Sequence, residues 1–409
     1  MDIRRLNQQR IWTSAEEKRA VVDFFPEVLE IEITSFCNFR CRMCPHALLE
    51  NRCARHLDPM VIEKLKPYLQ YTRKAALQGD GEPFMHPDLE KIIKGFAENG
   101  VRLTTTTNLS MISEHTARLM NETFDVITIS CDACEKEVYE KIRRNGSFDV
   151  FCKNLDILVS CAPKPALVMN CVMMRQNVHL AEKMVTFAEE HNIRHLVFSA
   201  LLTTAALHNE DDSLLLYPAI TREYLSAAET RAKKTGIDLQ ILWDYRSAQK
   251  QSEAGPEDEW ARYRNVKEEA EFTEEERKVS VERYRALKTK KSFKTCQAGK
   301  YHCQGICPNL YGKSYIDTEG NVTLCCFGKI NAVGNILEQD FSKIWNGDAY
   351  VSSRESFFRS ELPDFCIGCK FALSAQLNDN MPYPFRITDL DADFEDDASF
   401  WKNRTGAEG

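Results

Sequence analysis

Residues 33–44 read Ile-Thr-Ser-Phe-Cys-Asn-Phe-Arg-Cys-Arg-Met-Cys. The cysteines in this stretch come directly after an apolar, strand-like segment. The cysteines Cys37, Cys41 and Cys44 have the spacing CxxxCxxC. Electron-transfer clusters of the 4Fe-4S type are held by four cysteines, so three compact thiolates at the end of a strand leave one iron open. An open iron can bind a substrate or a cofactor, which indicates catalysis rather than electron transfer alone.

A structural zinc ion is the alternative for this triplet. Zinc sites usually combine one CxxC pair with a second pair or with two histidines. Nothing nearby in the sequence completes such a set of four ligands. The spacing therefore favours an iron-sulfur cluster.

The triplet resembles that of the radical S-adenosylmethionine (radical SAM) enzymes. This resemblance implies that the amino and carboxylate groups of SAM chelate the open iron of a 4Fe-4S cluster. It also implies that the reduced cluster cleaves SAM to a 5'-deoxyadenosyl radical, with an external one-electron reductant of the flavodoxin or ferredoxin type.

The pattern of apolar residues between positions 27 and 245 predicts an α/β fold. Apolar β-branched runs alternate with amphipathic stretches at intervals of about 25 to 40 residues, which is typical of βα units around a parallel sheet. A partial barrel fits best, and the family resemblance implies a TIM-like (β/α)6 partial barrel with its functional residues at the C-terminal ends of the strands. Strands are predicted over residues 28–34, 74–78, 102–107, 126–130, 166–172 and 195–200. Helices include residues 59–71, capped by Asp58, and 87–98, ending at Asn99-Gly100.

Composition divides the rest of the chain. Residues 246–295 include a run that is rich in Glu, Arg and Lys, which predicts a solvated helical linker. A second, smaller domain rich in cysteine follows, and the acidic end of the chain is expected to be loosely held. The predicted segments are 1–26 (N-terminal extension), 27–245 (barrel), 246–295 (linker), 296–375 (small α+β domain) and 376–409 (acidic tail).

Bulk properties exclude several classes of function. The formal net charge of -8 argues against a general nucleic-acid surface. No stretch approaches the roughly 20 continuous apolar residues of a membrane span, and the polar N-terminus has no signal-peptide core. Without an export signal, the 16 cysteines indicate reduced thiols and metal ligation rather than disulfides. A cytoplasmic protein without membrane or nucleic-acid partners is expected.

Gly79-Asp80-Gly81-Glu82-Pro83 follows the second predicted strand. Glycines let the backbone approach a ligand, and a carboxylate can receive an ammonium group. The stretch resembles the GGEP motif of the family, which implies that Glu82 binds the amino group of SAM beside Gly81. A simple Gly-Pro turn is the alternative.

Further positions for SAM follow from the same resemblance. Asn108 and Ser130, at the ends of the third and fourth predicted strands, offer polar groups for ribose hydroxyls or a carboxylate, unless they are ordinary turn residues. Arg143 resembles the arginine that pairs with the SAM carboxylate, and a solvated helix face is the alternative. Met43, within the triplet, can lie against adenine or simply pack.

The C-terminal cysteines resemble the SPASM/Twitch extension of radical SAM enzymes. Cys307 and Cys325 flank Gly320, and Cys366 and Cys369 form a CxxC pair. A β-hairpin turning at residues 318–321 would bring the first two cysteines to its two ends, and the CxxC pair would supply two more thiolates. The resemblance thus implies one auxiliary 4Fe-4S cluster with four cysteine ligands.

Two alternatives remain for this second site. Cys296, Cys303 and Cys326 are left over, and one of them could replace Cys307 or Cys325 as a ligand. A structural zinc ion would also accept four cysteines. A full SPASM domain has about seven cysteines for two clusters, and no cysteine follows Cys369, so one cluster is predicted.

An auxiliary cluster favours a net oxidation, because it can accept the electron of a substrate radical. The single-cluster form resembles alcohol dehydrogenases of aminoglycoside biosynthesis, which implies oxidation of a secondary alcohol of a small carbohydrate-like molecule. Formation of a thioether or carbon-carbon crosslink in a peptide is an alternative, although only about 27 residues precede the first strand, too few for a peptide-recognition domain. Epimerisation with Cys131, Cys134 or Cys171 as hydrogen donor and a non-enzymatic iron-sulfur scaffold are further alternatives.

Overall fold

The computed structural model describes residues 2–48, 54–161, 165–201, 209–243, 245, 256–265, 295–297, 307–325, 332–359 and 361–363. Within these ranges, ten strands form one sheet in the order β11-β10-β9-β1-β2-β3-β4-β5-β6-β7. The strands of this sheet are β1 (Val28–Ile31), β2 (Lys74–Leu77), β3 (Arg102–Thr107), β4 (Phe124–Ser130), β5 (Ala166–Met173), β6 (His195–Ala200), β7 (Asp238–Ile241), β9 (Lys313–Ile316), β10 (Asn321–Thr323) and β11 (Ala332–Asn335).

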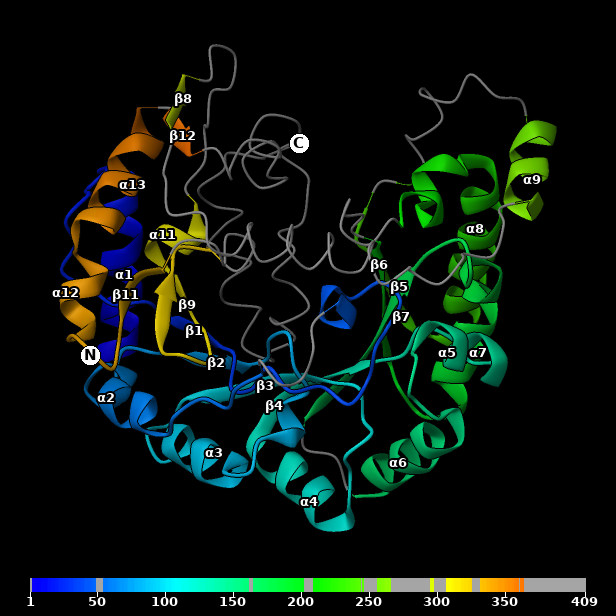
Figure 1. The fold of residues 1–409 in the computed structure, drawn as a ribbon, viewed down its shortest axis with the longest axis horizontal. Coiled ribbons are helices and arrows are strands. Elements are labelled where there is room, and N and C mark those ends of the chain that lie inside the picture. Colours follow the sequence, from blue (N-terminus) through cyan, green and yellow to red (C-terminus); the bar gives the residue numbers. More distant parts are fainter. Residues whose placement is uncertain are drawn as a thin grey trace.

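Helices follow the strands and cover one face of this curved sheet, as Figure 1 shows. Strands β1 to β7 are all parallel, so the predicted α/β partial barrel is confirmed. The helices of this layer and of the two ends of the chain are α1 (Ile3–Glu16), α2 (Met60–Leu69), α3 (Leu89–Ala97), α4 (Glu114–Thr123), α5 (Lys136–Ile142), α6 (Phe148–Ser160), α7 (Ala181–Glu190), α8 (Pro218–Thr235), α9 (Pro256–Asn265), α11 (Pro308–Tyr311), α12 (Phe341–Trp345) and α13 (Asp348–Phe358).

All six predicted strands are present, with ends that differ by up to three residues. A seventh, β7, pairs in parallel with β6 and was not predicted, because its four residues, Asp-Leu-Gln-Ile, give no apolar run. Both predicted helices also form. Asp58 accepts a hydrogen bond from the backbone N–H of Met60 (2.8 Å), which caps the first turn of α2 as expected.

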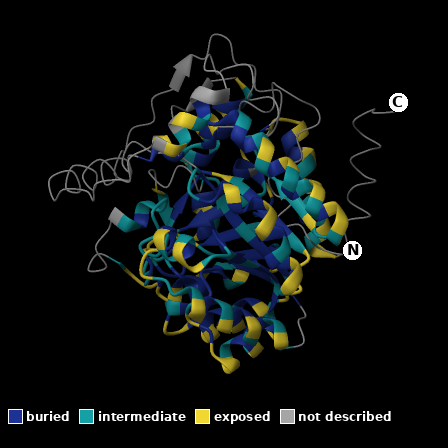
Figure 2. Ribbon diagram, turned by 90° about the vertical axis from the view of Figure 1, so that its right-hand side faces the viewer, coloured by how far each residue is buried: buried dark blue, intermediate teal, exposed yellow. Residues whose placement is uncertain are grey.

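Side chains alternate between the two faces of the sheet. Leu29 and Ile31 of β1 are buried in the core that the sheet shares with the helices, and the strands form the buried centre of the molecule in Figure 2. The opposite, concave face carries an apolar cluster near the start of the strands, made by Val126, Val168 and Val197. Polar side chains follow further along the strands, and the concave face therefore has an apolar floor below polar walls.

The C-terminal hairpin continues the barrel sheet. β9 pairs in parallel with β1, with Val28 opposite Lys313 and Ile31 opposite Ile316, and β10 pairs antiparallel with β9. The turn lies where it was predicted, and Gly320 has φ +79°, a left-handed conformation that favours glycine. The predicted boundary at residue 296 stays a prediction, but the hairpin is not detached from the barrel.

The expectation of a solvated linker is wrong for α9, which lies at the start of the charged segment. Trp260 packs edge-on against Tyr224 of α8, with 6.3 Å between ring centroids. The buried Glu259 accepts a hydrogen bond from the backbone N–H of Ile220 (2.9 Å). Aromatic side chains within a charged run therefore anchor this helix to the barrel. Residues 266–294 lie outside the described residues.

The N-terminal segment, predicted as an extension, forms α1 and joins the barrel to the C-terminal helices. Asn346, after α12, donates a hydrogen bond to the carbonyl of Val22 (2.8 Å) and accepts one from its N–H (3.0 Å). Arg354 of α13 is fully buried and donates to the carbonyls of Ala20 (2.9 Å) and Leu310 (2.8 Å). In the described ranges, no helix is long and apolar enough to cross a membrane.

Candidate SAM and iron-sulfur site

The cluster loop, defined as residues 35–48, follows β1 and carries Cys37, Cys41 and Cys44. Its backbone is held by neighbouring segments. The N–H groups of Arg40 and Arg42 donate to the carbonyls of Arg144 and Ile142, both at 2.9 Å. The loop therefore lies against the end of α5, at the C-terminal edge of the sheet where the family resemblance places the active site.

The three thiols lie in surroundings that oppose the thiolate form in the metal-free protein. Burial raises the pKa of Cys41 to about 12 and that of Cys44 to about 11, and it also raises the pKa of Cys37. The Arg143 guanidinium acts in the opposite direction on all three. Because iron binds the thiolate, cluster assembly has to release these protons.

No group of three Cys, His, Asp or Glu side chains in the described part of the chain is arranged to hold a single metal ion. In a 4Fe-4S cluster each cysteine binds a different iron, so the sulfur atoms stand further apart than around one zinc ion. The three thiols of the loop are one short of the four ligands that a structural zinc ion takes, so this donor set fits a 4Fe-4S cluster with one open iron.

Gly81 brings the predicted SAM motif into contact with the cluster loop. The N–H of Glu82 donates to the carbonyl of Phe36 (2.7 Å). A Cβ atom on Gly81 would lie 2.3 Å from the carbonyl oxygen of Thr34 and 2.5 Å from that of Phe36. Only glycine allows this approach, so the alternative of a simple Gly-Pro turn does not account for the position.

Glu82 is 3% exposed, and hydrogen-bond donors surround its carboxylate. It accepts from the Thr107 hydroxyl (2.7 Å) and from the backbone N–H groups of Asn108 (2.7 Å) and Phe84 (3.3 Å). Burial nevertheless raises the pKa of Glu82 to about 7, and these hydrogen bonds only partly offset it. A bound ammonium group would supply the missing positive charge, so the site fits the amino group of SAM.

Asn108 is buried next to Glu82 and close to the cluster loop. Its side-chain amide donates to Asn38 (3.0 Å) and lies 4.0 Å from the sulfur of Cys37. Its oxygen accepts from the backbone N–H of Ser110 (2.9 Å), as in an Asx turn. The turn and the contact with the cluster loop therefore occur together. Ser130 lies at the end of β4 on the concave face and is partly exposed.

Arg143 is 6% exposed, which rules out the alternative of a solvated helix face. Its Nε lies 2.7 Å from Oδ2 of Asp132, a carboxylate that is fully buried. Desolvation acts against the charged guanidinium, but Asp132 and the nearby Cys41 more than offset it, and the pKa of Arg143 is raised. Arg143 therefore stays charged beside the cluster loop, where it can pair with a carboxylate of SAM.

Met43 packs against an apolar cluster formed by Ile142 at the end of α5 and by Met174 and Leu201, which directly follow β5 and β6. This contact supports the packing alternative. Met43 itself stays partly exposed, so contact with adenine is still open to it.

Asp212 is a site residue that the sequence did not reveal. Its carboxylate pairs with Arg42 of the cluster loop (2.9 Å) and with Arg175 after β5 (3.5 Å), and Gln176 donates to it as well. It lies after β6, in a segment without a motif. The single-sequence pattern holds no signal for it, because its partners become neighbours only in the folded chain.

Two of the cysteines considered as hydrogen donors face away from the concave side. Cys131 and Cys171 are fully buried in the core shared with the helices, and burial raises the pKa of both. Cys134 is partly exposed but packs against the same core. The alternation along β4 and β5 instead places Ser130 and Asn170 on the concave face.

At the second predicted site, the structure brings two of the four cysteines into one neighbourhood. Cys307 immediately precedes α11, and Asn309 of this helix donates through its side chain to the sulfur of Cys325 (3.2 Å). Through Asn309, the segment that begins with Cys307 thus contacts Cys325, and the assignment of both cysteines to one cluster stays a prediction. Cys303, Cys326, Cys366 and Cys369 lie outside the described residues, and of Cys296 only the backbone in β8 (Thr295–Gln297), paired with β12 (Glu361–Pro363), is described.

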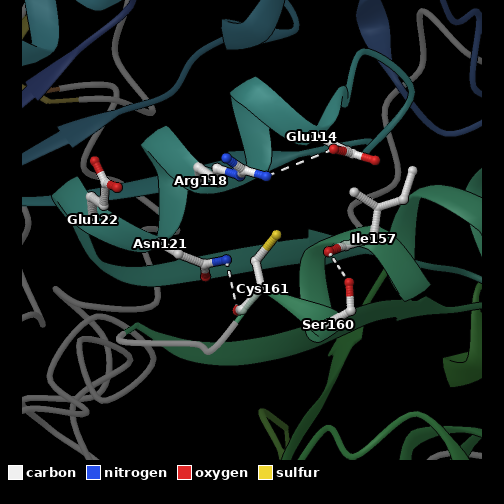
Figure 3. A pocket seen from close by; sticks show the side chains of 7 residues that line it. All are labelled: Glu114, Arg118, Asn121, Glu122, Ile157, Ser160 and Cys161. Carbon is white, nitrogen blue, oxygen red and sulfur yellow. Dashed lines mark hydrogen bonds and ion pairs between the residues drawn. The ribbon is translucent and has the colours of Figure 1, made fainter.

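Two cavities of the described residues can be compared with these sites. The larger, about 760 Å³, is an outer groove between α4 and α6, bordered by Arg118, Asn121 and Cys161 (Figure 3). None of the predicted site residues lines it, so its size does not make it the reaction site. The smaller, about 180 Å³, lies beside the cluster loop and is lined in part by Asn38 and Asn108.

Comparison with known families agrees with this arrangement. Residues 31–188 match the Radical SAM superfamily, and residues 307–370 match the SPASM family, an iron-sulfur cluster-binding domain. The chain therefore belongs to the radical SAM superfamily and carries a C-terminal SPASM domain. Its cofactors are a 4Fe-4S cluster with SAM and at least one auxiliary iron-sulfur cluster.

Individual relatives are distant. A probable GTP 3',8-cyclase of Sulfurisphaera tokodaii is 24% identical over 42% of this chain and 54% of its own length. The GTP 3',8-cyclase of Chlorobaculum tepidum is 28% identical over 36% of this chain and 46% of its own length. The chain thus spans about half the length of these relatives.

Solved structures show the fold. Streptococcus suis SuiB bound to S-adenosylmethionine has a TM-score of 0.58 and 16% identity, covering 86% of this chain and 72% of that chain. Native anSMEcpe with bound AdoMet has a TM-score of 0.53 and 16% identity, covering 85% and 88%.

Proposed function

We propose that this chain is a radical SAM oxidoreductase that oxidises a secondary alcohol of a small, carbohydrate-like molecule. The first cluster, which Cys37, Cys41 and Cys44 would hold, would supply with SAM the 5'-deoxyadenosyl radical that takes the hydrogen atom from the carbinol carbon. The substrate radical would then lose a proton and one electron to become a ketone, and an auxiliary 4Fe-4S cluster would accept that electron.

We assign the residues as follows. Glu82 binds the amino group of SAM, and Arg143 binds its carboxylate. Gly81 lets the backbone before Glu82 approach SAM closely. Asn108 and Ser130 are assigned to the ribose, and Met43 to the adenine. The cluster ligands are Cys37, Cys41 and Cys44 for the SAM-binding cluster, and Cys307, Cys325, Cys366 and Cys369 for the auxiliary cluster.

The polar wall of the concave face is the observation that carries the choice of substrate. Thr106 donates to Gln78 (2.8 Å), Gln78 donates to Glu30 (2.8 Å), and Glu30 pairs with Lys313 of the C-terminal hairpin. This network crosses four neighbouring strands, from β3 to β9. Groups that donate and accept hydrogen bonds in alternation favour a hydroxylated ligand over an apolar one.

The other half of the concave face has the same character. Ser199 of β6 donates to the side chain of Asn170 on β5 (2.8 Å), and both residues are only partly buried. Below them, Val126, Val168 and Val197 close the floor. A small molecule with several hydroxyl groups matches polar walls above an apolar floor, because each hydroxyl can replace its water contacts with side-chain partners.

The position of the cysteines argues against epimerisation. A hydrogen donor has to reach the substrate radical, but Cys131 and Cys171 belong to the core on the helix side of the sheet. Cys134, near the end of β4, is partly exposed, but its side chain packs against the same core.

The proposal is tested with the reconstituted holoenzyme under anaerobic conditions. A panel of small polyols and aminocyclitols is incubated with SAM and a one-electron reductant such as flavodoxin. The proposal predicts one ketone for each 5'-deoxyadenosine, with deuterium moving from a labelled carbinol carbon into 5'-deoxyadenosine. An alcohol of inverted configuration indicates epimerisation, and turnover of peptides without turnover of polyols indicates peptide maturation; either result overturns the proposal.

A matched pair of serine variants tests the concave face as the substrate site. Ser199→Ala removes a hydroxyl from the polar wall, and we expect a rise in KM of about two- to tenfold, the equivalent of one lost hydrogen bond. Ser160→Ala removes a hydroxyl in the outer groove, and we expect no change. SAM cleavage without substrate should be equal in both variants.

The proposed setting of the enzyme is the cytoplasm, where thiols stay reduced.

A further inference from the structure

Asn309 connects the two predicted auxiliary ligands that the structure describes. It lies two positions after Cys307, in α11, and its side-chain nitrogen is 3.2 Å from the sulfur of Cys325. The helix is tied to the first ligand by a hydrogen bond from the N–H of Leu310 to the carbonyl of Cys307 (3.1 Å). A hydroxyl of Thr323 donates to the carbonyl of Cys325 (3.3 Å) and helps to fix the second.

Of the two polar atoms of the Asn309 side chain, the nitrogen has a hydrogen-bond partner, the sulfur of Cys325, and the oxygen has none within the described residues. Asn309 is 9% exposed, and within the described residues Oδ1 is buried without a hydrogen-bond donor. A buried acceptor without a partner is unfavourable, because it has lost its hydrogen bonds to water. The side chain therefore keeps an unfavourable position for its oxygen while its NH2 group faces Cys325.

Chemistry fixes the orientation of this amide once iron binds. A cysteine thiolate has no proton to donate, so the NH2 group and not the oxygen of Asn309 has to face it. A hydrogen bond to an ionised acceptor is stronger than one to a neutral acceptor. The contact should therefore strengthen when Cys325 becomes a ligand.

We propose that Asn309 is a positioning residue that raises the reduction potential of the auxiliary cluster through its hydrogen bond to the sulfur of Cys325. Reduction of a cluster adds negative charge that is shared by its sulfur ligands, and a donor to one of them stabilises the reduced form. A higher potential makes the cluster a better acceptor for the electron of the substrate radical. This inference rests on the assignment of Cys325 as a ligand in the proposed function.

The contact at the SAM-binding cluster differs in strength. There the amide nitrogen of Asn108 lies 4.0 Å from the sulfur of Cys37, and its shorter bond, 3.0 Å, goes to Asn38. At the SAM-binding cluster, which has to deliver an electron, the amide of Asn108 is thus shared between Cys37 and Asn38. At the auxiliary cluster, which has to accept an electron, the amide of Asn309 is directed at the sulfur of Cys325. This difference agrees with a higher potential at the auxiliary cluster.

The test uses the full-length chain with Cys37→Ala, Cys41→Ala and Cys44→Ala, so that the auxiliary cluster alone gives a signal. Its midpoint potential is measured by redox titration with electron paramagnetic resonance (EPR). Asn309→Leu keeps the shape but removes the donor, and we expect a lower potential; a tenfold loss in the equilibrium constant for reduction corresponds to about 59 mV. Asn309→Asp, which adds negative charge, should lower it further.

Asn346→Leu is the matched control. Asn346 is another asparagine of the same C-terminal part, and its amide bonds to the backbone of Val22 instead of a cysteine. This variant should lose stability while the potential stays unchanged. A potential that is also unchanged in Asn309→Leu, at equal iron content, overturns the inference and leaves the proposed function standing.

A second measurement applies if the Asn309 variants do not hold iron. The cluster is then studied in the background that keeps Asn309, with asparagine labelled with nitrogen-15 in its side chain, and pulsed EPR of the reduced cluster reports nearby nitrogen nuclei. Coupling to the label supports the bond, and its absence overturns the inference. If the triple-cysteine background itself holds no iron, both the inference and the role of the auxiliary cluster as electron acceptor fail.

Discussion

Arg42 and Asp212 form a buried ion pair that joins the cluster loop to the segment after β6. The distance between Nε of Arg42 and Oδ2 of Asp212 is 2.9 Å, and their side chains are 9% and 3% exposed. Arg175 approaches the same carboxylate at 3.5 Å. One carboxylate thus neutralises two cations and fixes the loop that carries the three cysteines.

Asp212→Ala should therefore destabilise the protein strongly. It leaves the largely buried Arg42 and the partly exposed Arg175 without their shared carboxylate, and breaking a buried pair of this kind costs about 3 to 5 kcal/mol. Urea denaturation measures the loss. Asp149→Ala is the control, because Asp149 pairs with Lys136 on the surface and such exposed pairs contribute little to stability. Equal losses in the two variants would contradict the role of Asp212.

Glu82 should make the stability of the metal-free protein depend on pH. Its pKa is about 7 in the folded protein and about 4.5 in the unfolded chain, so the folded form holds the extra proton between these values. Stability therefore falls as pH rises from about 4.5 to 7, by about 3 kcal/mol in total. Denaturation at pH 5 and pH 7.5 should show this loss in the wild type. Glu82→Gln should lack it, and the same slope in both proteins speaks against a buried carboxylate.

Gly81→Ala should remove the SAM-binding cluster and spare the auxiliary one. Because the new Cβ would meet the carbonyl oxygens of Thr34 and Phe36, the backbone of the cluster loop has to move. Iron analysis after reconstitution should find about four irons per chain instead of about eight. Gly95→Ala in α3 is the control, since its Cβ would meet only a methyl group of Ile62 at 3.0 Å. Full iron content in Gly81→Ala is the opposing result.

Replacing Cys37, Cys41 and Cys44 by alanine together tests the independence of the second cluster. About four irons and four sulfides per chain should remain, because the C-terminal cysteines bind a separate cluster. Complete loss of iron would assign those cysteines to zinc or to free thiols. In that case a redox-neutral radical reaction becomes the better interpretation.

Arg354 should be needed for the attachment of the C-terminal helices. Its guanidinium lies 4.8 Å from the ring centre of Trp345 and donates to the carbonyls of Leu310 and Ala20. Arg354→Met keeps much of the volume but leaves two carbonyls without donors, which should cost about 3 kcal/mol. Arg359→Met, at an exposed position of the same segment, should cost less than about 0.5 kcal/mol in thermal unfolding. Similar losses at both positions would count against this attachment.

Local patterns predicted the parts of this protein that depend on neighbouring residues in sequence. The cysteine spacing, the glycines around Glu82 and the apolar strands all follow from short-range rules, and the structure has them where expected. The buried state of Arg143 and the role of Asp212 could not be predicted, because both depend on partners in other segments. The same holds for the pairing of β9 with β1, since a strand carries no local signal for a distant parallel partner.

This pairing has a consequence for how the chain is made. β1 can pair with β2 soon after both are synthesised, whereas its other neighbour, β9, leaves the ribosome only after residues 32–312 have been made. During that interval one side of Val28–Ile31 presents backbone groups without strand partners, and an open edge of this kind pairs readily with other chains. The time of greatest risk of aggregation is therefore translation itself, and the edge closes only when Lys313–Ile316 arrives.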